Sequence, residues 1–282
     1  MLKRTISGAV YCAIVVGFFL LRAYVRAVAF DAFLWFLCAF GSFELARALK
    51  DRELPCGFWT TVISGAVLPV IYVVAEHFLN KWNALYIILG VIGVIALSLL
   101  IVKLITKDTF KKWGVTVFTL VYPFLGVLSM MILNDVNGQA GVIGLYLIFI
   151  IPAISDTFAY LFGMLYNKIR KGKALRLAPN LSPKKTWAGA IAGAVGGALA
   201  GLLVYVVFKP VPRIASPLFI FIFVGFVASI VGIFGDLFES YIKRSVGIKD
   251  MGRIMPGHGG VLDRIDSMLF IAPYILLMMV LM

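Results

Sequence analysis

Long runs of apolar residues, separated by short polar segments, dominate the pattern along this chain. Several runs are near or above the roughly 20 residues that a helix needs to cross a bilayer. The alternation of apolar and polar residues that is typical of a transmembrane β-barrel does not occur. The pattern therefore predicts an all-α, polytopic integral membrane protein with about nine transmembrane helices, over residues 5–22, 28–48, 58–79, 84–105, 113–133, 140–163, 187–208, 216–241 and 262–282.

Composition agrees with this fold class. Hydrophobic residues make up 62% of the 282 residues, charged residues only 14%, and the mean hydropathy is +1.03. A soluble domain would carry about 25% charged residues. No cleavage pattern of a secretory signal follows the first run, so we expect it to be kept as a helix. We expect one membrane domain over residues 1–282, with scaffold spans in 1–139 and catalytic spans and loops in 140–282.

Basic residues gather on one side of the predicted membrane. With nine spans, 21 of the 26 Lys and Arg residues lie in segments on the side of the N-terminus, and the other five lie opposite. Because cytoplasmic loops carry an excess of Lys and Arg, the N-terminus is predicted to be cytoplasmic and the C-terminus outside. The net charge of +13 is then explained by basic cytoplasmic loops that bind anionic lipids and phosphate ligands. No nucleic-acid partner is expected. We expect a multi-pass protein of the inner or plasma membrane, with its active site facing the cytoplasm.

The seventh predicted span carries a regular row of glycines. Gly189, Gly193, Gly197 and Gly201 recur every four residues and therefore line one face of a helix. Small residues at this spacing let two helix backbones approach closely. The row predicts packing against another helix of the chain or against a second subunit, and it does not distinguish between them.

Several acidic residues fall within or at the ends of the later spans. An ionised carboxylate in the hydrocarbon costs about 3 kcal/mol, so such residues need a reason. Gathered on one side of the membrane, they indicate a shared cavity filled by water or a cation. The alternative is a set of separate ion pairs with nearby arginines. The residues are Asp156, Asp236, Glu239, Asp263 and Asp266, whereas Glu44, inside the second span, has no assigned role.

Spacing sharpens this prediction. Asp236, Glu239 and Lys243 lie on one helix face, at positions i, i+3 and i+7. Asp263 and Asp266 share a face of the next span. Two helices are thus expected to offer carboxylates to one point. Oxygen ligands without Cys, and with little His, favour a hard cation such as Mg²⁺, which usually comes with substrate phosphates.

Two cytoplasmic segments are suited to phosphate. In SPKKT (182–186), Ser182 is predicted to cap the seventh span with Pro183 in its first turn, so that the helix N-terminus and two lysines bind an anion. The alternative is a simple positive anchor on the cytoplasmic side. In PGHGG (256–260), glycines allow backbone N–H groups to face a phosphate, and His258 either contacts that phosphate or holds the turn.

These features favour phosphoryl or nucleotidyl transfer. Such reactions need charge neutralisation and in-line positioning more than proton transfer. A phosphate monoester has a second pKa of about 6, so as an acceptor it is largely anionic near neutral pH and requires no general base.

The segment SYIKRSVGIKDMGRIMPGHGGVLDRID (240–266) resembles the signature of CDP-diacylglycerol synthases, also called phosphatidate cytidylyltransferases. DTFAYLFG (156–163), SPKKT (182–186) and GDLFES (235–240) resemble further motifs of that family, in the family's order. The resemblance covers about residues 154–267, and residues 1–150 match only as generic spans. It implies that CTP and phosphatidic acid give CDP-diacylglycerol and pyrophosphate, the lipid phosphate attacking the α-phosphorus of CTP.

The resemblance also implies a homodimer with a divalent-metal centre in a cytoplasmic cavity. It makes Asp236 and Asp263 the metal ligands, with Asp266 and Asp156 as further candidates, and it allows K⁺ as a second cation, which the sequence alone does not suggest. We predict as catalytic Asp236, Asp263, Asp266, Lys249, Asp250, His258 and Arg264. We predict as substrate-binding Asp156, Ser182, Lys184, Lys185, Thr186, Glu239, Lys243, Arg244, Arg253, Gly259 and Gly260.

One position departs from the family's pattern. After SPKKT the family usually carries an acidic residue two positions on, whereas this chain has Ala188 there. The loss of an acid beside a phosphate-binding segment is expected to weaken metal binding or to alter the conformation of that segment.

Two other functions are open on the residues. A CTP-dependent polyprenol kinase also combines many spans with basic cytoplasmic loops, although the string PGHGGVLDRIDS favours the cytidylyltransferase. A secondary transporter also buries acids in broken helices, but it would place them near the midplane between inverted repeats, and no repeat is visible here.

Overall fold

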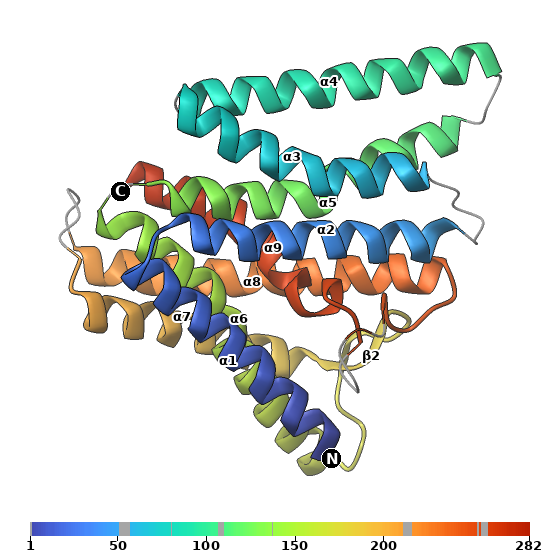
Figure 1. Cartoon of the computed structure of the whole chain (residues 1–282). Coiled ribbons are helices and arrows are strands. Elements are labelled where there is room, and N and C mark those ends of the chain that lie inside the picture. Colours follow the sequence, from blue (N-terminus) through green and yellow to red (C-terminus); the bar gives the residue numbers. More distant parts are fainter. Residues whose placement is uncertain are drawn as a thin grey trace. The chain divides into compact units, whose positions relative to one another are not determined.

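The computed structural model describes residues 2–50, 57–79, 81–106, 110–136, 138–210, 216–252, 254 and 259–282. Within them the chain forms nine helices and one two-stranded hairpin (Figure 1). The helices are α1 (Leu2–Tyr24), α2 (Val28–Lys50), α3 (Phe58–Phe78), α4 (Lys81–Thr106), α5 (Phe110–Asn134), α6 (Gln139–Ile169), α7 (Trp187–Phe208), α8 (Pro217–Ser245) and α9 (Leu262–Leu281).

Each predicted span coincides with one of these helices, which confirms the all-α membrane fold. Seven of the described helices, α2, α3 and α5 to α9, are long and apolar enough to cross a membrane. The described apolar parts of α1 and α4 are shorter, over Gly8–Tyr24 and Leu85–Ile101, so the crossing of these two helices stays a prediction. Helices α6 and α8 run several residues past their predicted ends, because their last turns are polar and leave no hydrophobic signal.

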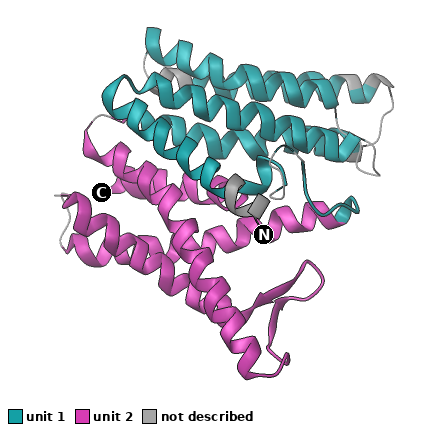
Figure 2. Ribbon diagram, turned by 60° about the horizontal axis from the view of Figure 1, so that its bottom comes forward, with its two compact units in different colours: residues 1–135, 245–265 teal, residues 136–244, 266–282 magenta. Residues whose placement is uncertain are grey.

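The chain divides into two compact units (Figure 2). Unit 1 comprises residues 1–135 and 245–265, and unit 2 comprises residues 136–244 and 266–282. Helix α9 therefore begins in unit 1 and continues in unit 2. The expected single domain, with scaffold and catalytic parts on either side of residue 139, stays a prediction.

In unit 1, α2 is the central helix and contacts α1, α3 and α5. Its buried residues form one broad face toward these helices, whereas Phe36 and Phe40 on the opposite side are exposed. Gly41 faces the start of α9, where an added Cβ would lie 3.4 Å from Leu262. Gly65 of α3 lies so close to Ser42 that a Cβ would be 2.2 Å from its hydroxyl oxygen. Small residues thus bring α3 and the first turn of α9 against α2.

A buried polar cluster joins the ends of α1, α2 and α5. The guanidinium of Arg22 donates to Asn134 Oδ1 at 2.6 Å, and Asn134 Nδ2 donates to Asp31 Oδ1 at 2.8 Å. Nearby, the Tyr72 hydroxyl of α3 donates to Asp135 at 2.8 Å. Asp31 is only 5% exposed, so these bonds replace the water that its carboxylate loses on burial.

In unit 2, the glycine row of α7 packs within the chain. A Cβ on Gly189 would lie 2.8 Å from the carbonyl oxygen of Ala159 in α6. A Cβ on Gly201 would lie 2.0 Å from the carbonyl oxygen of Phe221 in α8, and one on Gly197 would lie 2.5 Å from that of Gly225. Of the two packing partners that the sequence left open, the structure shows neighbouring helices of the same chain.

Replacing Gly201 with Val is expected to lower the free energy of unfolding by about 2–3 kcal/mol or more, because the added methyl groups overlap the backbone of α8. Leu203→Val is the matched control, since Leu203 is 47% exposed on the same helix. Denaturant titration in mixed micelles measures both. Equal unfolding midpoints for the two variants would contradict the assigned α7–α8 contact.

The segment between α6 and α7 corrects one local prediction. Residues Ser182–Thr186 form strand β2, which pairs antiparallel with β1 (Arg176–Ala178). The predicted helix cap at Ser182 is therefore wrong. Thr186 is the cap instead, because its backbone is still extended while its side chain accepts the N–H of Gly189 at 3.1 Å.

Candidate active site

A cavity of about 510 Å³ lies in unit 2 between α6, the hairpin, the start of α7 and α8. Asp156, Tyr160 and Asn167 line it from α6. Lys184 and Lys185 line it from β2, and Asp236 lines it from α8. The structure thus brings the acid of α6, the lysines of SPKKT and the first acid of α8 to one cavity, although they come from three separate motifs.

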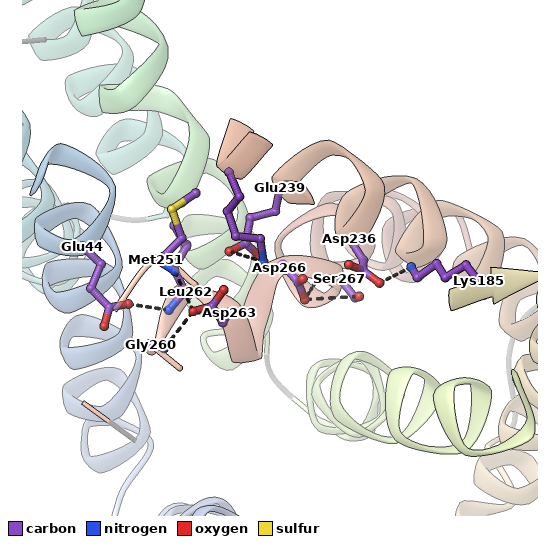
Figure 3. A network of polar contacts seen from close by, with 11 residues as sticks. Glu44, Lys185, Asp236, Glu239, Met251, Gly260, Leu262, Asp263, Asp266 and Ser267 are labelled. Carbon is purple, nitrogen blue, oxygen red and sulfur yellow. Dashed lines mark hydrogen bonds and ion pairs between the residues drawn. The ribbon is translucent and has the colours of Figure 1, made fainter. Parts of the chain in front are cut away.

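An ion pair in this cavity joins Lys185 to Asp236. The lysine ammonium pairs with Asp236 Oδ2, and each side chain is 29% exposed (Figure 3). A pair at this depth is screened less by water than a surface pair. The contact fixes the hairpin against α8 and places one positive and one negative charge at the cavity wall.

Further carboxylates lie beside Asp236 on α8 and α9. Asp266 lies near Glu239 and close enough to Asp236 and Lys243 to interact with their charges. Glu239 is fully buried, and its Oε1 lies 3.4 Å from the Lys243 ammonium one helical turn away. The predicted face of α8 is thus formed, and it meets Asp266 as expected.

Gly235 explains why these acids lie so close. A Cβ on Gly235 would lie 2.9 Å from the carbonyl oxygen of Asp266, so α8 and α9 touch backbone to backbone just before Asp236. Only glycine allows this approach. The close crossing carries the carboxylates of both helices to one place.

The neighbouring carboxylates of α8 and α9 repel each other, and the repulsion is stronger in a medium of low dielectric. Lys185 and Lys243 each offset one negative charge. The oxygen-only donor set suits a hard divalent cation. Among the described residues, no group of three Asp, Glu, His or Cys side chains is arranged to hold a metal ion. Mg²⁺ therefore agrees with the chemistry of the oxygen donors only, and its binding here stays a prediction.

Asp263 lies in unit 1, in the first turn of α9. Its Oδ2 accepts the N–H of Met251 at 2.9 Å and that of Gly260 at 2.8 Å, and the residue is 9% exposed. Gly259 has φ +88° beside this carboxylate, where a Cβ would lie 2.6 Å from Oδ2. The glycines thus fold the loop around Asp263, and the phosphate contact expected of Gly259 and Gly260 stays a prediction.

A second cavity, of about 580 Å³, lies in unit 1 between α2 and residues 248–252 with Ile254. Arg47, Lys249 and Asp250 line it together with Glu44. In the same unit, Nε of Arg264 is buried without a hydrogen-bond partner among the described residues. A buried guanidinium nitrogen of this kind is suited to an anionic ligand.

The remaining predicted residues have varied positions. Thr186 is buried and caps α7, and Ser182 pairs with Ala178 in the hairpin. Arg244 Nε donates to the carbonyl oxygen of Leu181 at 3.4 Å and so holds the hairpin to α8. Arg253 and His258 lie outside the described residues. Whether Asp236 and Asp263 hold one ion stays a prediction, since the two residues belong to different units.

Sequence reasoning missed two features of these sites. Arg176 donates to Asn167 at 3.2 Å, and both line the first cavity, but nothing in their surroundings in the sequence indicates this. Glu44 stands out in the sequence as an acid inside a span, which is enough to mark it as a residue that needs a buried partner. Its partner could not be predicted, because Leu262 is distant in sequence.

Fold and site together define a multi-pass helical membrane protein whose second unit brings carboxylates and lysines to one cavity. A family model described as the cytidylyltransferase family matches residues 2–282. The chain belongs to this family, which confirms the predicted resemblance.

Similar proteins named phosphatidate cytidylyltransferase occur in several bacteria. The one from Rickettsia prowazekii is 32% identical over 235 residues, covering 82% of this chain and 94% of the relative. The one from Staphylococcus epidermidis is 32% identical over 190 residues, covering 67% and 68%. The one from Helicobacter pylori is 36% identical over 149 residues, covering 53% of this chain and half of the relative.

Proposed function

We propose that this protein transfers the cytidylyl group of CTP to phosphatidic acid, giving CDP-diacylglycerol and pyrophosphate for phospholipid synthesis. The observation that carries the proposal is the cavity that Lys184, Lys185 and Asp236 line, in which Lys185 pairs with Asp236. Three relatives of the chain carry the name of this activity.

The reaction requires little proton chemistry. An oxygen of the lipid phosphate forms a bond to the α-phosphorus of CTP. The bond between the α-phosphorus and the oxygen that bridges it to the β-phosphorus breaks, and pyrophosphate leaves with the electron pair of that bond. Near neutral pH the lipid phosphate is already largely anionic. The chain's task is therefore to hold two polyanions together, and we assign Lys184, Lys185 and Arg264 to the phosphates.

Mg²⁺ is part of the proposal. Asp236 would hold it, with Asp263 and Asp266 as the further ligands expected from the sequence. When bound, the ion would neutralise charge on the triphosphate. A second cation such as K⁺ and a homodimer remain proposals that rest on the resemblance alone.

We also propose that the site faces the cytoplasm from the cell membrane. Within unit 1, contacts join helix ends that the predicted alternation puts on the same side. Glu44 near the end of α2 contacts Leu262 at the start of α9, and Arg22 near the end of α1 contacts Asn134 at the end of α5. The choice of the cytoplasmic side rests on the excess of Lys and Arg there.

A single assay tests the reaction. Purified protein receives phosphatidic acid, Mg²⁺ and CTP labelled in the cytidine, and the lipid products are separated. Labelled CDP-diacylglycerol is expected. A new lipid monophosphate together with CDP would favour the polyprenol kinase, and absence of turnover with uptake into vesicles would favour the transporter.

Ala188→Glu is expected to raise the rate, or to lower the Mg²⁺ concentration needed for half-activation, by about 2–5-fold. Residue 188 lies in the first turn of α7, which has no acidic residue, and an acid there interacts favourably with the helix N-terminus. Rates measured across a series of Mg²⁺ concentrations check this, with Ala188→Gln as the uncharged control. Equal rates for the parent protein and the Ala188→Glu variant at every concentration would show that the departure is neutral.

A further inference from the structure

Glu44 is a buried carboxylate to which neither the sequence nor the proposed reaction gives a role. It lies in the second half of α2 and is 2% exposed. Its Oε2 accepts the N–H of Leu262, the first residue of α9, at 2.9 Å (Figure 3). These two residues are 218 positions apart in the sequence.

This contact supplies a helix cap from a distant part of the chain. The first N–H groups of a helix have no partner within the helix and carry a partial positive charge. A local Ser, Thr, Asp or Asn usually satisfies them. The residue before α9 is Val261, which has no polar side chain, so the carboxylate of Glu44 takes the place of the local cap.

Two glycines leave the space that the Glu44 carboxylate fills. A Cβ on Gly252 would lie 2.0 Å from Oε1, and a Cβ on Gly260 would lie 2.3 Å from Oε2. Both distances are far below van der Waals contact, so neither position admits a side chain while Glu44 keeps its place. Gly252 and Gly260 thus leave the space through which Glu44 reaches Leu262.

The same loop is held from its other side by Asp263. This residue follows Leu262 directly, and its Oδ2 accepts the N–H groups of Met251 and Gly260. Gly260 thus lies between the carboxylates of Glu44 and Asp263. Any shift of the α9 N-terminus would move both Asp263 and the loop that encloses it.

We propose that Glu44 is a positioning residue that caps α9 and thereby fixes the Asp263 carboxylate for the reaction. The effect on turnover rests on the proposed function, whereas the cap itself does not. Partners that orient a metal ligand or catalytic group typically contribute about 10–100-fold. We therefore expect Glu44 to act on the rate of turnover with little effect on the binding of CTP.

Two variants at Glu44 and one control test this. Glu44→Leu removes the acceptor oxygens at similar volume, whereas Glu44→Gln keeps one carbonyl oxygen for Leu262. Asp31→Asn alters another buried, hydrogen-bonded acid of the same helix, which contacts Asn134 and not the loop. Hydrogen–deuterium exchange of peptides covering residues 245–265 is measured in each purified protein, together with kcat and KM for CTP.

Glu44→Leu is expected to speed amide exchange at residues 260–263 by at least about tenfold. Its kcat should fall by about 100-fold while KM for CTP changes less than about twofold. Glu44→Gln should restore protection and recover kcat to within about tenfold of the parent. Asp31→Asn should leave exchange of this segment unchanged.

Unchanged exchange at residues 260–263 in Glu44→Leu would overturn the cap. Faster exchange with unchanged kcat would overturn the positioning role, as would equally faster exchange throughout the molecule. If the parent protein makes no CDP-diacylglycerol, the proposed function fails, while the exchange measurement still decides whether Glu44 caps α9.

Discussion

Asp236→Asn is expected to reduce CDP-diacylglycerol formation by at least about 10³-fold. The substitution removes the negative charge that pairs with Lys185 at the cavity wall and removes one carboxylate from the group next to Asp266. Both changes act on the charge distribution that would hold Mg²⁺ and the phosphates. Turnover of labelled CTP by protein reconstituted with phosphatidic acid measures the effect.

A matched control separates chemistry from folding in this experiment. Asp135 accepts a hydrogen bond from Tyr72 in unit 1 and has no place in the proposed site. Asp135→Asn should therefore keep the rate within about threefold, in the range of an ordinary surface or structural substitution. Nearly normal turnover in Asp236→Asn would remove Asp236 from the site and leave its contact with Lys185 as a structural ion pair.

Asp263→Asn is expected to abolish measurable turnover, a loss of at least about 10²-fold, while the protein still inserts into the membrane. The amide oxygen of Asn can still accept from Met251 or Gly260, so the loop should keep much of its shape. The lost rate would then report the lost charge. Exchange protection of residues 251–260 and turnover should be measured on the same preparation.

The two measurements together decide the role of Asp263. Lost turnover with a protected loop supports the expected metal-binding or phosphate-directed role. Nearly normal activity would contradict it and leave Asp263 as a loop anchor. Asp263→Glu serves as the control, since it keeps the charge but lengthens the side chain in a closely packed position.

The spans were predictable because each rests on a long apolar run, and length together with hydropathy determines such helices. The C-terminal ends of α6 and α8 could not be predicted from hydropathy, because their last turns are polar and yet remain helical. SPKKT was expected to begin the seventh span with Ser182 as its cap. It forms a strand instead, because it pairs with Arg176–Ala178, and this pairing has no signal of its own in the sequence.

The site was predictable in its parts and less so in its contacts. Regular spacing placed Asp236 and Glu239 on one face correctly, because that follows from helix geometry. The partner of Asp236 proved to be Lys185, on a different motif, which depends on how the hairpin folds back. The role of Glu44 was out of reach, since a cap supplied across 218 residues leaves no local pattern.

The glycine face of α7 has a consequence for how two copies of this chain can meet. Gly189, Gly197 and Gly201 face the backbones of α6 and α8, so that surface is already occupied inside each molecule. The opposite face of α7 presents branched apolar side chains, among them Ile191, Val195 and Leu203, which are 47–64% exposed. Any homodimer must therefore associate through bulky side chains or through other helices, and a small-residue helix crossing at α7 is not available to it.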